Sequence, residues 1–162
     1  MLNHPLPRID KDEILRKMLL PYCRFKEGTI WIDAKERHKI ACINVSNKDE
    51  VKKIFGKTKV ILSVQDPPYN FIAFSEKQND EFIKWCLEWI TLNIEISDKN
   101  SSFYFCLCAD QSNHFEPFGS FIEIMKSTGL TSRSFITMRN QRGYGTQYNW
   151  MAIRQELLYY IS

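Results

Sequence analysis

One short apolar run constrains the fold of this chain more than any other segment. Residues 59–64 are compact, apolar and rich in β-branched side chains, and they run directly into Gln65-Asp66-Pro67-Pro68-Tyr69-Asn70. A run of this kind is typical of a strand that is buried on both faces, as in the parallel sheets of α/β proteins. We therefore expect a buried strand that delivers a polar loop at its carboxyl end.

Helix and strand signals alternate along the rest of the chain. Asp10 is expected to cap a first helix that ends at Pro21, and Ser46 to open a second helix that Gly56 closes. Longer helices are expected over residues 79–94 and 117–127, with Trp85 and Trp89 of the first packing in the core. Further strands are expected at residues 29–32, 39–43, 103–108, 134–138 and 157–161, with a polar loop over residues 139–149.

This order of elements predicts an α/β fold with helices on the faces of a sheet. The 162 residues suffice for a core of ordinary size, and 44% hydrophobic with 25% charged residues indicates a globular protein. The formal net charge of +3 is compatible with a nucleic-acid partner but does not require one. No apolar run is long enough to span a bilayer, so we expect no membrane partner.

The five cysteines are Cys23, Cys42, Cys86, Cys106 and Cys108. Their odd number and the lack of a signal peptide favour reduced thiols in a cytoplasmic protein. Cys106 and Cys108 alternate along an apolar run and would share one face of a strand. No second Cys or His pair offers ligand spacing, so we expect no metal site and interpret the cysteines as small core residues.

The polar loop after the apolar run carries the groups of a candidate active site. In α/β sheets, ligands bind at the carboxyl ends of strands. The Asp66 carboxylate and the carbonyl groups beside Pro67 and Pro68 are acceptors, while Tyr69 offers a flat aromatic face. Two acceptors can hold the two hydrogens of an exocyclic amine while the ring stacks on its base, which is catalysis by positioning. An ordinary proline turn is the alternative interpretation of these four residues alone.

Asp66-Pro67-Pro68-Tyr69 resembles motif IV of the DNA amino-methyltransferases, in which Asp-Pro-Pro-Tyr is typical of adenine-N6 enzymes. Residues 38–42, 46–56 and 59–70 resemble the lead-in of the subclass in which motif IV precedes the cofactor motif. Residues 142–147, 149–151 and 154–160 resemble its late catalytic segment. The resemblance covers residues 29–161 and implies a three-layer Rossmann-like methyltransferase sheet.

The resemblance also implies roles for individual residues. Asp66 and the Pro67 carbonyl would accept hydrogen bonds from the adenine amino group, Pro68 would complete the catalytic loop, and Tyr69 would stack on the flipped base. S-adenosyl-L-methionine would donate the methyl group without a metal, and Asn44 and Asp66 would bind it.

The partner implied by the resemblance is DNA. Arg142, Tyr144 and Tyr148 would contact it, together with Arg139 and Arg154, and a solvated loop is the alternative interpretation of these residues. RNA is a further possibility, because the related mRNA enzymes have Trp in place of the tyrosine; Tyr69 favours DNA.

Two departures from the family indicate an incomplete enzyme. The Phe-x-Gly-x-Gly loop that contacts the cofactor is absent, and its nearest match, Phe118-Gly119-Ser120, is expected inside a helix. Asn44 stands where family members usually have Asp. We therefore expect residues 1–28 to form a helical extension and residues 29–162 a partial catalytic domain without its cofactor-loop half. A complementary methyltransferase polypeptide or a homo-oligomer would complete the enzyme, and the alternative is a non-catalytic homologue that binds nucleic acid or a partner subunit.

Overall fold

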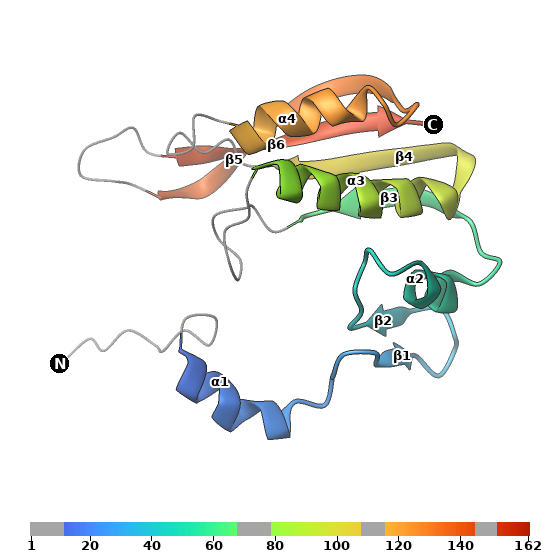
Figure 1. Cartoon of the computed structure of the whole chain (residues 1–162), viewed down its shortest axis with the longest axis vertical. Coiled ribbons are helices and arrows are strands. Elements are labelled where there is room, and N and C mark those ends of the chain that lie inside the picture. The colour runs from blue at the N-terminus through green and yellow to red at the C-terminus, as the bar shows by residue number, and fades with distance from the viewer. Residues whose placement is uncertain (1–11, 68–78, 108–115, 145–151) are drawn as a thin grey trace. The chain divides into compact units, whose positions relative to one another are not determined.

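A computed structural model describes residues 12–67, 79–107, 116–144 and 152–162 of the chain (Figure 1). The chain divides into two compact units, residues 1–44 and residues 45–162. Each unit is described by itself. The domain boundary expected after residue 28 falls within the first unit and stays a prediction.

The first unit contains the helix α1 (Glu13–Leu19), a 3-10 turn (Leu20–Tyr22) and the antiparallel strands β1 (Ile30–Ile32) and β2 (Lys39–Ala41). Both strands were expected. The cap of α1 is Asp12, whose carboxylate accepts a hydrogen bond of 2.9 Å from the Leu15 amide; the expected cap, Asp10, lies outside the described residues. Pro21 does not end the helical segment, because it sits in the first turn of the 3-10 helix, where no amide hydrogen is needed.

The second unit is built on a four-stranded sheet with the strand order β3-β4-β6-β5. Its strands are β3 (Val60–Gln65), β4 (Ser97–Leu107), β5 (Thr131–Tyr144) and β6 (Ala152–Ile161). β3 and β4 are parallel, whereas β6 runs antiparallel to both β4 and β5. Figure 1 shows α3 (Asn79–Glu95) and α4 (Glu116–Met125) side by side on one face of this sheet. The mixed sheet with its helices confirms the α/β class.

A short helix, α2 (Lys48–Phe55), precedes β3. Its cap is Asn47 rather than the expected Ser46, because the Asn47 side chain accepts hydrogen bonds from the Asp49 and Glu50 amides. Gly56 ends the helix as expected, with a positive φ of 56° that favours glycine.

The core lies between the sheet and the helices α3 and α4. Trp89 of α3 contacts Phe105 of β4 and Phe121 of α4, with ring centroids 6.0 and 6.3 Å apart. Phe105 and Phe121 meet edge to face at 5.6 Å. The expected packing role of Trp89 is therefore confirmed, and Trp85 lies half-buried against the same cluster.

The burial expected for β3 was wrong. Leu62 and Val64 are 57% and 63% exposed, whereas Ser63 is only 5% exposed. Ser63 faces the helices, because it bonds to Asn93 of α3, so its neighbours Leu62 and Val64 point to the opposite face. Within the described residues β3 pairs with β4 alone, which leaves its other edge without a strand.

The prediction of a polar loop over residues 139–149 was also wrong in part. β5 continues to Tyr144, and it pairs with β6 through Arg139↔Arg154 and Tyr144↔Ala152. Polar side chains do not prevent pairing when a partner strand supplies the backbone hydrogen bonds. The last two strands are consequently longer than the apolar pattern predicted.

The cysteines differ in burial. Cys86 is fully buried in the core, and burial raises the pKa of its thiol to about 12. Cys23 and Cys42 are exposed, so their interpretation as core residues was wrong. Cys108 lies outside the described residues. Within the described part of the chain, no helix is long and apolar enough to cross a bilayer.

We predict that Phe121→Ala lowers the free energy of unfolding by about 3–5 kcal/mol, because it leaves a cavity beneath Trp89 and Phe105. Phe135→Ala is the matched control, since this ring is 54% exposed, and should cost about 1 kcal/mol or less. Urea unfolding of both variants measures the difference. Equal losses would contradict the placement of the core.

Candidate functional site

Asp66 and Pro67 lie where the sequence pattern puts them, directly after β3. Gln65, the last residue of β3, pairs with Phe105, two residues before the end of β4. Because β3 and β4 are parallel, both strands end at the same edge of the sheet. Asp66 is exposed at this carboxyl edge and Pro67 is half-buried, so the loop begins where α/β sheets bind their ligands.

The electrostatics of Cys106 place the Asp66 carboxylate beside β4. Burial raises the pKa of the Cys106 thiol, and the negative charge of Asp66 raises this pKa further. Cys106 lies one residue beyond Phe105, the register partner of Gln65. The negative charge of the Asp66 carboxylate is therefore felt near the carboxyl ends of the parallel strands β3 and β4.

A buried polar cluster lies under the strand that carries Asp66. The Ser63 hydroxyl oxygen accepts a hydrogen bond of 2.8 Å from the side-chain amide of Asn93 and one of 2.7 Å from the side-chain amide of Gln65. Ser63 and Asn93 are buried, at 5% and 8% exposure. The cluster fixes the carboxyl half of β3 to α3, because breaking it would leave polar atoms unpaired in the core.

Sequence reasoning missed these three polar residues. The signal was available, since Ser63 and Gln65 alternate with Leu62 and Val64 in a run that was interpreted as apolar on both faces. Alternation of this kind indicates a strand with one polar and one apolar face. Here the polar face is the one that meets the helix.

The other predicted site residues are distributed as follows. Pro68, Tyr69 and Tyr148 lie outside the described residues. Arg142 and Tyr144 lie on β5. Asn44 is exposed and belongs to the first unit, whereas Asp66 belongs to the second.

Phe118-Gly119-Ser120 does not form a cofactor loop. As expected, all three residues lie inside α4. Phe118 packs edge to face on Phe135, with ring centroids 5.9 Å apart. A Cβ atom at Gly119 would meet nothing within 4 Å, so no close approach requires glycine there. This segment therefore offers no loop for the methionine part of S-adenosyl-L-methionine. The described residues contain no group of three or more potential metal ligands.

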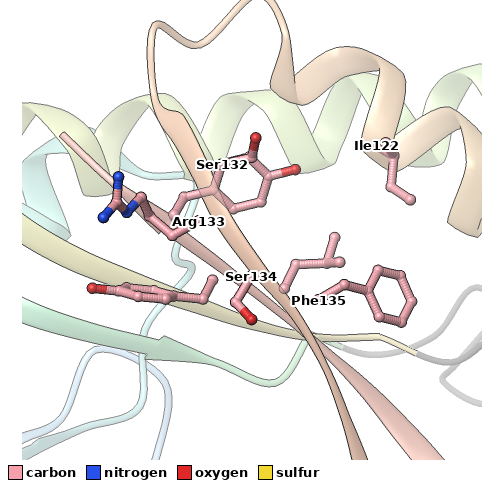
Figure 2. A pocket seen from close by; sticks show the side chains of 8 residues that line it. Ile122, Ser132, Arg133, Ser134 and Phe135 are labelled. Atoms are coloured by element: carbon pink, nitrogen blue, oxygen red, sulfur yellow. The ribbon is translucent and has the colours of Figure 1, made fainter.

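A pocket of about 290 Å³ lies on β5 and β6 next to α4 (Figure 2). Figure 2 shows Ile122 of α4 and Phe135 at one end of the pocket and Arg133 at the other end. The pocket is at the bulge between Ser132 and Ser134, where the register of β5 and β6 shifts. None of the predicted site residues that the structure describes is among those that line it.

No protein-family model and no curated protein matches this sequence. Solved structures do match. A crystal structure of M1.HpyAVI in complex with SAM matches at 16% identity and a TM-score of 0.47, over 70% of this chain and 48% of that chain. A crystal structure of M1.HpyAVI matches at 15% identity and a TM-score of 0.48, over 71% and 53%. This chain thus spans about half the length of these two structures.

We predict that Asn93→Ala lowers the free energy of unfolding by about 1–3 kcal/mol, because Ser63 loses a buried hydrogen-bond donor. Thr91→Ala is the control, since its hydroxyl bonds to the Leu87 carbonyl on the exposed side of the same helix and should cost about 0.5 kcal/mol or less. Chemical unfolding compares the two. A loss at Asn93 no larger than that at Thr91 would show that the cluster does not hold β3.

Proposed function

We propose that this chain is the adenine-holding part of a site-specific DNA adenine-N6 methyltransferase. The observation that carries the proposal is the position of Asp66 and Pro67 at the carboxyl edge of the parallel strands β3 and β4. The Asp-Pro-Pro-Tyr sequence there has the acceptors and the aromatic ring that an adenine amino group and its base require.

This loop contributes to the reaction by holding the adenine amino group in position for methyl transfer. The Asp66 carboxylate and the Pro67 carbonyl accept the two hydrogens of the flipped adenine's amino group, Pro68 restricts the backbone, and Tyr69 stacks on the base. Holding the amine in this way directs its lone pair toward the reacting carbon and removes most of the orientational cost of the step.

S-adenosyl-L-methionine supplies the methyl group when it is bound, and no metal is needed. Asn44 and Asp66 are the residues of this chain proposed to contact it. Phe118-Gly119-Ser120, the nearest match to a glycine cradle for its methionine part, lies inside α4, and we propose that a complement supplies the remaining contacts.

The outer edge of β3 supports the need for a complement. Residues 60–65 contain no charged residue and no proline, although such residues protect natural sheet edges from unwanted pairing. Leu62 and Val64 are more than half exposed on the face opposite α3. A complementary methyltransferase polypeptide, or a second copy of this chain, would pair with this edge and cover this face. The assembled enzyme would act on DNA in the cytoplasm, with Arg142, Tyr144 and Tyr148 contacting the nucleic acid.

One observation favours a second candidate function. Gly119 lies inside a helix with open space around it, so the chain's best match to the cofactor loop is not a loop. A non-catalytic homologue that binds nucleic acid or a partner subunit would need no such loop.

We predict that Asp66→Ala reduces adenine methylation by at least about 100-fold in a complex reconstituted from the chain and its complement, because the amine loses a positioning acceptor. Transfer of a labelled methyl group to DNA measures the effect. Asp80→Ala, at an exposed position in the first turn of α3, is the control and should stay within a few-fold of wild type. Activity of Asp66→Ala in that same range would contradict the proposal.

A further inference from the structure

The pocket beside α4, at the bulge of β5 and β6, plays no part in the proposed function. Its volume is about 290 Å³, close to the lower limit of the range of about 300–1,000 Å³ that is usual for ligand pockets, so it suits a small molecule. In the described sheet β5 lies at one margin and β3, which precedes Asp66, lies at the other. The strand that carries Asp66 and the strand that carries the pocket are thus separated by β4 and β6.

A β-bulge builds one wall of this pocket. Ser132 and Ser134 pair with consecutive residues of β6, so Arg133 is the extra residue between them. Successive side chains of a regular strand point to opposite faces, yet residues 132–135 all line the pocket. The bulge therefore redirects side chains of β5 toward one place, as bulges next to functional sites commonly do.

The pocket has an apolar end and a charged end. Figure 2 shows Phe135 and Ile122 at one end and Arg133 at the other. Leu158, the register partner of Phe135, also lines the pocket and is only 4% exposed. Phe135 is more than half exposed, so a ligand that covered its ring would remove apolar surface from water.

The charged end offers donors and no acid. Arg133 is the one charged side chain that lines the pocket, and within the described part of the chain its guanidinium has no hydrogen-bond or ion-pair partner. The Tyr160 hydroxyl is likewise without a hydrogen-bond partner among the described residues, and burial raises the pKa of this tyrosine, which keeps the hydroxyl protonated as a donor. Glu123, which follows Ile122 on α4, is paired with Lys126. The lining therefore suits an anion.

We infer that this pocket binds a small carboxylate with an apolar body, whose carboxylate pairs with Arg133 and whose apolar part covers Phe135 and Ile122. The planar guanidinium fork matches the two oxygens of a carboxylate, and such charge-assisted hydrogen bonds are strong ones. One arginine neutralises one negative charge, which favours a carboxylate over the dianion of a phosphate monoester. The apolar body is needed as well, because an exposed ion pair alone contributes little.

The test is a ligand-observed NMR titration of the full chain with 3-phenylpropionate, a carboxylate that carries one aromatic ring. Its dissociation constant should lie below about 1 mM. Arg133→Gln should raise this constant at least about tenfold, because a charge-assisted hydrogen bond is lost, and Phe135→Ala should raise it at least about threefold, because apolar contact is lost. Arg37→Gln, at an exposed position of the first unit, is the matched control and should leave it unchanged.

Two related compounds separate the charge from the apolar body. 3-Phenylpropanamide lacks the charge and propionate lacks the ring, so each should bind at least about tenfold more weakly than 3-phenylpropionate. This comparison uses the unaltered chain, so it decides the question even where a substitution disturbs the fold. Binding of either compound as tight as that of 3-phenylpropionate would overturn the inference.

Two further results would also overturn it. One is the absence of 3-phenylpropionate binding at about 10 mM, and the other is equal binding by Arg133→Gln and the unaltered chain. Tighter binding of phenyl phosphate would overturn the choice of a carboxylate and assign the pocket to phosphate monoesters.

Discussion

Parallel hydrogen bonding between β3 and β4 determines where Asp66, the described carboxylate of the candidate site, lies. It brings both strand ends to one edge of the sheet, so Asp66 leaves β3 beside Cys106 of β4. β6 then pairs antiparallel to β4, and the pairing of β5 with β6 continues past that same edge. If β3 ran in the opposite direction, Asp66 and this end of β5 and β6 would lie at opposite edges.

The two faces of β3 differ in polarity because one face packs against α3 and the other faces away from the core. Its helix-facing side carries Ser63, which bonds to Asn93 and Gln65, while Leu62 and Val64 face away from the core. An apolar outer side gains nothing from exposure to water. An apolar outer face suits a strand whose second face is covered by another polypeptide. This is the physical basis for expecting a complement.

The sequence predicted the elements of the second unit well because their hydrophobic patterns are long. The pattern over residues 79–94 became α3, and the β-branched run became β3 with Asp66 just after it. The burial of β3 could not be predicted, since an apolar run does not reveal how many neighbours a strand has. The length of β5 was missed because residues 139–144, which belong to this strand, have no apolar alternation. The hydrogen bond between Asn93 and Ser63 joins residues 30 positions apart, so it depends on tertiary packing that local patterns do not contain.

Our central claim is a proposal: the chain holds the target base and relies on a complement for part of the methyl-donor site. Isothermal titration of the full chain with S-adenosyl-L-methionine tests this claim most directly. We expect a dissociation constant weaker than about 1 mM, because Asn44 and Asp66 alone cannot replace a glycine cradle. A dissociation constant in the low micromolar range, about −8 kcal/mol of binding free energy, would contradict it.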